Sequence, residues 1–310
     1  MAARSLFIIT GASRGFGRSI ALALADSPLV TAQPTDIVLA ARSVDGLHET
    51  QRAVERIFNE ADVTTRHPLA LHVCAVDFGS PTVDVACDLV VSRTVPHPPG
   101  AYHSVTLVNN AGSLGRLARI RDQTLEDVRR NLELNVTAPL VLTAAFLKRF
   151  ASECARTVVV NVSSLAAVQP FDTWGVYSAN KAARDMFHRV VALEEGIIEA
   201  EETLPGIVER AGNDETLGTA PARHGRVRVL NYAPGPLDTD MQARIRAEMP
   251  NVQLRQVYVK MHDEGRLVDP NDSAKVLVSM LESDDYDNGA HVDFYDVQQH
   301  HASKTTLVGK

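Results

Sequence analysis

Short apolar runs rich in β-branched residues alternate with longer, helix-like stretches along almost the whole chain. The apolar runs cover residues 6–10, 37–41, 69–76, 105–108, 158–162, 227–230 and 291–294. The clearest helix-like stretches cover residues 15–26, 43–60, 122–150 and 173–195. Because the runs are continuously apolar instead of alternating with polar residues, they are typical of strands that are buried on both faces.

This alternation of strand and helix constrains the fold. It predicts right-handed crossovers and the α/β class, with a single Rossmann-type, doubly wound parallel sheet that carries helices on both faces. In such sheets ligands bind beyond the carboxyl ends of the strands. We therefore expect the functional residues in the loops that follow the strands.

One segment interrupts the alternation. Residues 197–225 separate a helix from a strand, where a connection of about two to six residues is usual. We interpret residues 197–225 as an inserted surface segment with a structural or interface role. Residues 1–296 are then expected to form one domain, and residues 297–310 a polar, frayed C-terminal tail. In that tail the adjacent His300 and His301 favour disorder over a metal site.

Composition and charge exclude several classes of partner. The chain has 310 residues, with 31 Lys+Arg against 38 Asp+Glu, so its formal charge is −7. This balance gives no electrostatic reason to bind nucleic acid or an anionic membrane. The first apolar run is too short for a signal peptide, and no apolar stretch is long enough to span a membrane. The chain has three widely separated cysteines, which favour a reducing compartment. We expect a cytoplasmic protein without a metal.

A glycine-rich turn, TGASRGFG, directly follows the first predicted strand at residues 10–17. Its glycines, Gly11, Gly15 and Gly17, allow backbone N–H groups to approach a pyrophosphate at the start of the next helix. The position between strand and helix favours a dinucleotide site. A tight turn without a ligand is the alternative.

Two arginines indicate which dinucleotide this turn would bind. An NAD site places a carboxylate at the end of the second strand, but this chain has Ala40, Ala41 and Arg42 there. Arg14 in the glycine turn and Arg42 carry the charge needed to clamp a 2′-phosphate. The sequence therefore favours NADPH over NADH, with two solvated surface arginines as the alternative.

The reacting group is predicted from Tyr177 and Lys181, which lie four residues apart and so on one face of a helix. A phenol titrates near 10, and a neighbouring cation is expected to lower its pKa. Tyr177 would then donate a proton to a carbonyl oxygen as hydride arrives from the nicotinamide. Ser163 and Ser164 follow the fifth strand and place a hydroxyl that could hold the same oxygen, or could cap the next helix.

Together these motifs resemble the short-chain dehydrogenase/reductase family. They are the glycine turn, the Asn-Asn-Ala-Gly loop at 109–112, Ser164 with Tyr177 thirteen residues later, Lys181, and Pro234-Gly235 followed by Thr239. The resemblance spans nearly the whole chain. It implies an NADPH-dependent carbonyl reductase with the catalytic residues Asn135, Ser164, Tyr177 and Lys181.

The resemblance also implies roles for further residues. The carbonyl of Asn135 would hold a water that relays protons to Lys181, and Lys181 would also hold the nicotinamide ribose. Residues implied to contact the cofactor are Gly11, Ser13, Arg14, Gly15, Phe16, Gly17, Arg42, Asp77, Asn109, Ala111, Gly112, Lys181, Leu237, Thr239 and Met241. Family members pair through the stretches 122–150 and 173–195, so a homodimer is implied.

Longer strings are similar to family members that reduce the side-chain ketone of a pterin in tetrahydrobiopterin biosynthesis. These strings are SSLAAVQPFDTWGVYSANKAARDM, VRVLNYAPGPLDTDM and GAHVDFYD. The similarity implies that Asp293 grips the amino edge of the pterin through two parallel hydrogen bonds. The implied substrate-binding residues are Ser164, Phe171, Trp174, Tyr177, Gly235 and Asp293.

Other interpretations remain open at this point. From the residues alone, Asp293 is equally a turn or salt-bridge residue, and Phe171 and Trp174 are equally core residues. A broader dicarbonyl or aldehyde reductase of the same family is one alternative function, and a non-enzymatic NADPH-binding sensor is another. The insertion, the tail and Ser178, where some relatives carry cysteine, depart from the family pattern.

Overall fold

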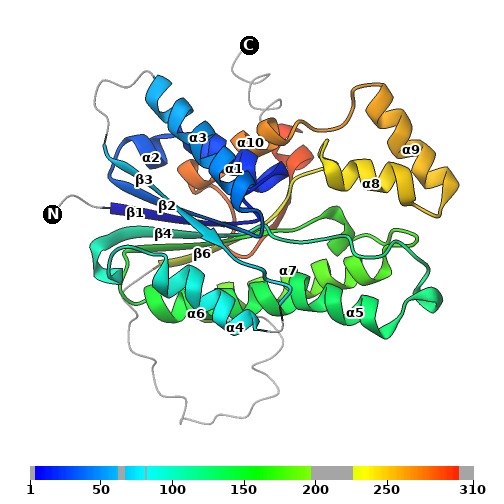
Figure 1. Ribbon diagram of the computed structural model, residues 1–310, viewed down its shortest axis with the longest axis horizontal. Coiled ribbons are helices and arrows are strands. Elements are labelled where there is room, and N and C mark those ends of the chain that lie inside the picture. Colours follow the sequence, from blue (N-terminus) through cyan, green and yellow to red (C-terminus); the bar gives the residue numbers. More distant parts are fainter. Residues whose placement is uncertain (1–3, 62–66, 81, 197–225, 300–310) are drawn as a thin grey trace, which may run out of the picture.

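The computed structural model describes residues 4–61, 67–80, 82–196 and 226–299. Within that part, seven strands form one parallel sheet in the order β3-β2-β1-β4-β5-β6-β7 (Figure 1). The strands are β1 (Arg4–Thr10), β2 (Thr35–Ala41), β3 (Leu69–Ala75), β4 (Tyr102–Asn109), β5 (Arg156–Val162), β6 (Arg226–Ala233) and β7 (His291–Asp293). The strand order reverses direction between β1 and β4, which places a ligand crevice at their carboxyl ends. The predicted α/β fold is confirmed.

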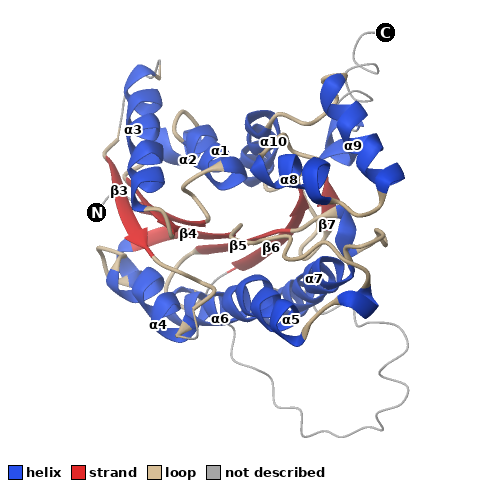
Figure 2. Ribbon diagram, turned by 45° about the vertical axis from the view of Figure 1, so that its right-hand side comes forward, coloured by secondary structure: helices blue, strands red, loops and turns tan. Residues whose placement is uncertain are grey.

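Helices cover both faces of the sheet (Figure 2). One layer contains α1 (Gly15–Leu24), α2 (Pro28–Thr31), α3 (Val44–Glu60) and α10 (Pro270–Ser283). The other contains α4 (Val83–Asp88), α5 (Leu125–Leu132), α6 (Ala138–Phe150) and α7 (Gly175–Glu195). Two further helices, α8 (Asp240–Glu248) and α9 (Val252–Asp263), follow β6. Short helical turns are η1 (Leu89–Arg93), η2 (Pro99–Ala101), η3 (Ile120–Asp122), η4 (Glu133–Thr137) and η5 (Leu165–Ala167).

The two helical layers explain why the strands are continuously apolar. Along β1, Phe7 and Ile9 belong to the core beneath α1 and α10, while Leu6 and Ile8 belong to the core beneath α6 and α7. Successive side chains of a strand point to opposite faces, so both sets need apolar residues.

The predicted helical stretch 122–150 is helical from Leu125 to Phe150, but a π-helical turn interrupts its regular α-helix. The Thr124 side chain and Asp127 form a capping box that begins α5. A π-helical turn, η4, then separates α5 from α6. Pro139 follows this turn; it has no N–H, so it cannot donate the α-helical bond to the carbonyl of Asn135. The turn and the proline together set the rotation of Asn135 relative to α6.

The predicted insertion 197–225 lies outside the described residues, as do His300 and His301. Residues 294–299 form a further helical turn, and Val297 packs against the core, so the ordered chain extends past Asp296 into the predicted tail. The cysteines, Cys74, Cys87 and Cys154, are all free and buried. Among the described helices, none combines the length and the apolar character needed to cross a lipid bilayer.

Candidate active site

The glycine turn has the geometry of a phosphate cradle. Gly11 and Gly15 have φ angles of +67° and +53°, which residues with a Cβ rarely adopt. A Cβ on Gly17 would lie 2.4 Å from the carbonyl oxygen of Gly11. In the described part of the chain, no side chain caps the first turn of α1. Its N–H groups therefore remain available to an anion at the positive end of the helix.

The Asn-Asn-Ala-Gly loop is fastened to this turn. The Asn110 Nδ2 donates to the Thr10 carbonyl at 2.8 Å, and the backbone N–H groups of Asn110 and Ala111 donate to the Thr10 hydroxyl at 2.9 and 3.0 Å. A Cβ on Gly112 would lie 3.0 Å from the Oδ1 of Asn135. The ends of β1 and β4 thus form one rigid floor, open to a ligand at Gly112.

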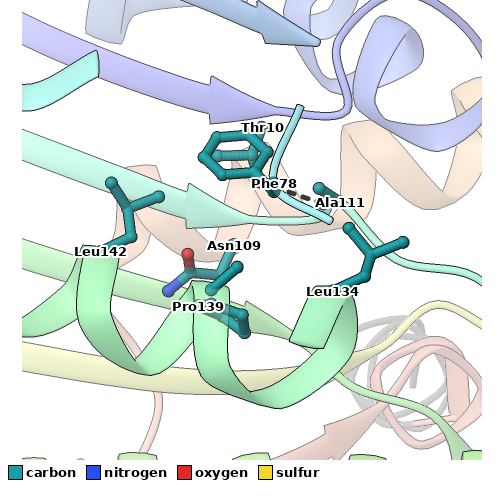
Figure 3. Close-up of a pocket in the computed structure, with 8 residues that line it drawn as sticks. Thr10, Phe78, Asn109, Ala111, Leu134, Pro139 and Leu142 are labelled. Atoms are coloured by element: carbon teal, nitrogen blue, oxygen red, sulfur yellow. Dashed lines mark hydrogen bonds between the residues drawn. The ribbon is translucent and has the colours of Figure 1, made fainter. Parts of the chain in front are cut away.

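A small pocket lies beside this floor, between the ends of β1 and β4 and the start of α6 (Figure 3). Its lining is apolar except for Thr10 and Asn109, and includes Phe78, Ala111, Leu134, Ala138, Pro139 and Leu142. The Oδ1 of Asn109 is buried and has no hydrogen-bond partner among the described residues. This pocket adjoins the loop that is expected to hold the cofactor's adenosine half.

The remaining predicted cofactor residues lie at the rim of the same crevice. Arg14 is exposed and its Nη1 contacts the Asp240 carboxylate at 2.8 Å, while Arg42 is exposed directly after β2. The methyl carbon of Thr239 would lie 3.7 Å from a Cβ on Gly15, so the loop after β6 returns to the glycine turn. The other predicted residues, Ser13, Asp77, Leu237 and Met241, follow the ends of β1, β3 and β6 and are at least partly exposed.

The side chain of Phe16 packs in the core. Its ring is buried and stacks on Tyr232, with centroids 6.2 Å apart and planes at 20°. Its side chain is therefore a core residue, and only its backbone lies in the cradle.

Ser164, Tyr177 and Lys181 meet at the carboxyl end of β5. Tyr177 and Lys181 are buried on α7, and the Nζ of Lys181 lies 5.6 Å from the centroid of the Tyr177 ring. The Nζ donates to the Val162 carbonyl at 2.6 Å. The hydroxyl of Ser164 faces the Tyr177 phenol and accepts from the Ala166 N–H at 3.2 Å, so it also caps η5.

Lys181 does not lower the pKa of Tyr177, which corrects the sequence prediction. Burial raises the pKa of Tyr177 to about 12, and the hydrogen bond from Ser164 and the charge of Arg184 only partly oppose this. Burial, followed by the charge of Arg184, lowers the pKa of Lys181 well below its usual value. The spacing of Tyr and Lys could not show that both side chains leave water.

Asn135 lies in η4, close to this group but facing the loop after β4. Its Oδ1 accepts from the Ser113 N–H at 2.9 Å, and its Nδ2 donates to the Ser113 carbonyl at 2.8 Å. This pair of bonds fixes the loop that carries Gly112. The side chain is therefore occupied, and the backbone carbonyl cannot accept an α-helical bond from Pro139.

A stack of aromatic rings lies next to Tyr177. Trp174 stacks on Phe171 with centroids 5.2 Å apart, and meets the Tyr177 ring edge-on at 5.7 Å. Tyr258 from α9 stacks on the other side of Trp174 at 6.2 Å with the planes at 14°. Sequence reasoning missed Tyr258, although Leu254 and Tyr258 are four residues apart and pack on the same cluster. Side chains four residues apart share one face of a helix, so this spacing could have indicated that Tyr258 packs toward the site.

Asp293 and Gly235 lie together at the far side of the crevice. Ala233 at the end of β6 pairs with Asp293 on β7, and Gly235 follows with φ +79°. The Oδ1 of Asp293 accepts from the Tyr295 N–H at 2.9 Å, as the turn interpretation expects. Two strand spacings, roughly 10 Å, separate the ends of β5 and β7. Ser164 and Asp293 therefore lie two strands apart along the carboxyl edge of the sheet.

Sequence reasoning also missed a buried polar group behind the crevice. Arg184 and His188 have no exposed surface, and Asp185 is nearly covered. All three lie on α7, within two turns of Lys181.

Comparisons with known proteins agree with this geometry. The family model for short chain dehydrogenase matches residues 5–220. A sepiapterin reductase of Rattus norvegicus is 36% identical over 294 residues, which cover 94% of this chain and 96% of that protein. One of Bos taurus is 37% identical over 305 residues, with coverage of 94% and 95%. A benzil reductase ((S)-benzoin forming) of Bacillus subtilis (strain 168) is 30% identical over 287 residues, with coverage of 89% and 93%.

Solved structures support the fold. The KRED1-Pglu enzyme has a TM-score of 0.68 at 23% identity, and the match covers 93% of this chain and 100% of that one. L-sorbose reductase from Gluconobacter frateurii has a TM-score of 0.65 at 24% identity, with coverage of 94% and 95%. Since a family model spans most of the sequence and relatives above 30% identity span nearly all of it, this chain is an oxidoreductase that belongs to the short chain dehydrogenase family.

Proposed function

We propose that this chain is a sepiapterin reductase, which uses NADPH to reduce the side-chain ketone of a pterin. The observation that carries this proposal is the row along the sheet edge, with a proton donor beside β5 and a carboxylate beside β7. Two strand spacings, roughly 10 Å, suit a fused bicyclic ring with a short side chain. The names of the mammalian relatives support the same substrate.

In the proposed reaction the protein supplies the proton and binds the carbonyl. A pKa of about 12 keeps the Tyr177 phenol protonated at neutral pH, which is the form that donates. Its proton passes to the ketone oxygen, while Ser164 holds that oxygen by a hydrogen bond. The nicotinamide cofactor, when bound, supplies the hydride to the carbonyl carbon, so the ketone becomes an alcohol. Lys181 then returns a proton to the tyrosinate, and the predicted Asn135 relay would recharge Lys181.

The pterin would lie with its ring against the Phe171–Trp174–Tyr258 stack. Flat rings favour such faces, and each aromatic pair adds about 0.5 to 1.5 kcal/mol. The carboxylate of Asp293 would accept two parallel N–H bonds from the amino-pyrimidine edge. The Nε1 of Trp174 is a buried donor without a partner among the described residues, so a bound heterocycle has a further group to meet.

The cofactor assignment rests on the shape of the crevice. The uncapped start of α1 and the close approach of Gly11 and Gly17 fit a pyrophosphate. Arg14 and Arg42 lie at the rim where a 2′-phosphate would sit, and no carboxylate ends β2. We expect Arg42→Ala to raise the KM for NADPH about tenfold, corresponding to one charge-assisted bond, and to leave the KM for NADH unchanged.

We also propose a cytoplasmic homodimer. On α7 the exposed apolar side chains Met186, Val190 and Leu193 recur with helical spacing, which suits a helix that packs against a second copy. Reduced, buried cysteines support a reducing compartment. Analytical ultracentrifugation of the wild type tests the assembly, and Met186→Glu is expected to weaken it.

The Bacillus relative favours a second candidate, a reductase of aromatic diketones. The test is the ratio of kcat/KM for sepiapterin to kcat/KM for benzil, both with NADPH. Our proposal expects sepiapterin to be the better substrate. It also expects Asp293→Asn to lower kcat/KM for sepiapterin roughly thirtyfold, which corresponds to about 2 kcal/mol, and to leave kcat/KM for benzil unchanged. The second candidate would be correct if kcat/KM is higher for benzil than for sepiapterin and if Asp293→Asn leaves kcat/KM for sepiapterin unchanged.

A further inference from the structure

Asp185 is a buried carboxylate on α7 that joins two strands which are not neighbours in the sheet. Its Oδ1 accepts from the hydroxyl of Ser163 at 2.6 Å and from the Nδ2 of Asn161 at 2.9 Å, at the end of β5. Its Oδ2 lies 2.6 Å from the Nδ1 of His291, the first residue of β7. Since β6 lies between β5 and β7, the carboxylate spans β6 from the side of α7.

A row of polar side chains faces this carboxylate. Asn161, Asn231 and His291 occupy the same register on β5, β6 and β7, so their side chains point to one face of the sheet. The helix α7 packs across this face (Figure 2). The Nδ2 of Asn161 donates both to the Oδ1 of Asn231 at 2.9 Å and to Asp185. The row therefore supplies the hydrogen bonds without which burying a carboxylate would be costly.

The two strands that Asp185 joins are not equally well fixed. Nearly all of β5 pairs with β4 on one side and with β6 on the other. In the described part of the chain, β7 is an edge strand of three residues that pairs with β6 alone. A short edge strand has few backbone hydrogen bonds to hold it in place. The contact between Asp185 and His291 therefore ties the less constrained strand to the better constrained one.

Each of the two tied strands carries one end of the proposed substrate site. At the end of β5, Ser164 directly follows Ser163. On β7, Asp293 lies two residues after His291, which places both side chains on the same face of the strand. The position of β7 relative to β5 therefore sets the separation between Ser164 and Asp293.

We propose that Asp185 is a positioning residue that determines substrate specificity, because it fixes the separation between Ser164 and Asp293. This inference rests on the pterin reduction proposed above. A pterin would hold its ketone at Ser164 and its amino edge at Asp293, so its binding needs both points at a fixed separation. A diketone such as benzil has no amino edge, so its binding does not depend on where β7 lies. Asp185 thus acts on the choice of substrate and not on the proton transfer.

The test follows the selectivity ratio, which is kcat/KM for sepiapterin divided by kcat/KM for benzil, both measured with NADPH. His291→Leu keeps a side chain of similar volume but removes the nitrogen that contacts Asp185. We expect this variant to lower the selectivity ratio at least about fivefold, mainly by raising the KM for sepiapterin. The reason is that a misplacement of about 1 Å can cost up to a hundredfold in rate. The value of kcat/KM for benzil should stay near that of the wild type.

Two control variants separate this role from a general loss of stability. Ser163→Ala removes a hydrogen bond to the same carboxylate but leaves β7 attached, so both substrates should be affected equally and the selectivity ratio should not change. His291→Gln keeps an N–H donor for Asp185 and should restore most of the ratio. Ser163→Ala and His291→Leu should both lower the melting temperature, since each removes one hydrogen bond to a charged group. A merely structural role would lower both melting temperatures without separating the two substrates.

Combining His291→Leu with Asp293→Asn shows whether the effect passes through Asp293. We expect the double variant to have the selectivity ratio of Asp293→Asn alone, since the positioned group is already lost. An unchanged ratio in a folded His291→Leu, an equal loss in His291→Gln or Ser163→Ala, or additive losses in the double variant would each overturn the proposal. His291→Ala replaces His291→Leu if the latter does not fold.

The single variant Asp293→Asn distinguishes failure of this inference from failure of the pterin assignment. If Asp293→Asn leaves the selectivity ratio unchanged, the pterin assignment is wrong and the role of Asp185 is wrong with it. If Asp293→Asn lowers the ratio and His291→Leu does not, only the role of Asp185 is wrong.

Discussion

The two ends of the sheet bury charge in opposite ways. At the amino end, Asp36 on β2 is almost completely buried and contacts Arg4 and His72 at 3.0 Å and the Tyr102 hydroxyl at 3.2 Å. At the carboxyl end, buried polar atoms of Asn109, Trp174, Ser178, Asn180, Arg184, Gln242 and His291 have no partner among the described residues. The Asp36 carboxylate is satisfied by the protein itself, whereas most of the partnerless buried polar atoms lie at the carboxyl end; the exceptions among the described residues are in Arg149, Thr157 and Tyr286.

The difference separates stability from function. Buried polar atoms are nearly always hydrogen-bonded in folded proteins, so clustered exceptions call for an explanation. Here most of them gather where the fold predicts a ligand. We infer that the amino end contributes free energy of folding and that the carboxyl end gives some of it up for chemistry. Each prediction below tests one side of this contrast.

Tyr177→Phe should have the largest effect. Removing the general acid is expected to lower kcat at least about a hundredfold, because no other group in the site replaces its proton. The free energy of unfolding should change little, since the ring and its contact with Trp174 remain. Steady-state kinetics and urea unfolding measure the two effects. A variant within tenfold of wild-type turnover would remove Tyr177 from the mechanism.

Asp36→Asn should lower stability and leave turnover unchanged, which is the opposite of the effect expected for Tyr177→Phe. We expect it to lower the free energy of unfolding by roughly 2 kcal/mol, less than for a fully buried pair because Arg4 and His72 are partly exposed. The value of kcat should stay near that of the wild type. Urea unfolding measures the change, with the exposed pair of Asp88 and Arg93 as the control site. An Asp88→Asn variant should behave like the wild type.

The contribution of Asp36 should also depend on pH. Burial acts to raise the pKa of Asp36, but hydrogen bonds from His72 and the charge of Arg4 prevail and hold it below its ordinary value of 3.8. A lowered pKa in the folded state gives stability that is present above about pH 4 and is lost as the pH falls through the folded pKa. The gap in melting temperature between the wild type and Asp36→Asn should therefore narrow below about pH 4. If the difference in melting temperature instead widens below about pH 4, the pKa of Asp36 is not lowered in the folded state.

Tyr258→Leu tests the aromatic side of the carboxyl end. Losing the ring stacked on Trp174 is expected to raise the KM for sepiapterin about three- to tenfold, because one aromatic pair contributes about 0.5 to 1.5 kcal/mol. The value of kcat should change little, since Tyr258 donates no proton in the proposed reaction. Tyr258→Phe keeps the stack and serves as the control. Equal KM values for both variants would place the ring outside the substrate site.

Thr173→Gly should have the smallest effect, and it should be stabilising. Thr173 has a φ of +68°, which is unusual for a β-branched residue, and it directly precedes Trp174. Relief of about 1 to 2 kcal/mol of strain is offset by about 0.5 to 1 kcal/mol of glycine entropy, so we expect a gain of about 0.5 kcal/mol. Thermal unfolding measures it, and Thr173→Ala should show no gain.

Much of the fold was predictable because apolar runs mark buried strands. The predicted strands all exist, but β1, β2 and β5 begin two residues earlier than their apolar runs. Arg4, Thr35 and Arg156 start these strands, and their backbones pair in the sheet although their side chains are polar. Hydropathy detects which side chains are buried, and it does not detect which backbones are paired.

The site was predictable where spacing fixes a face, and not where burial decides. Ser164, Tyr177 and Lys181 meet as expected, because a strand end and a helical turn bring them together. Arg184 escaped notice, since an arginine in a helix ordinarily points to solvent. The direction of the pKa change at Tyr177 was wrong for the same reason: a sequence does not show how completely a phenol is covered.

The π-helical turn η4 has a consequence for how this architecture can change. Such a turn holds one residue more than a regular helical turn, so deleting one residue from Glu133–Thr137 would let the flanking helices merge. The sheet and the glycine cradle would survive this shortening, but Asn135 would rotate away from Ser113. A single lost codon would thus release the loop that carries Gly112, and we expect dinucleotide binding and turnover to weaken together in a protein that still folds.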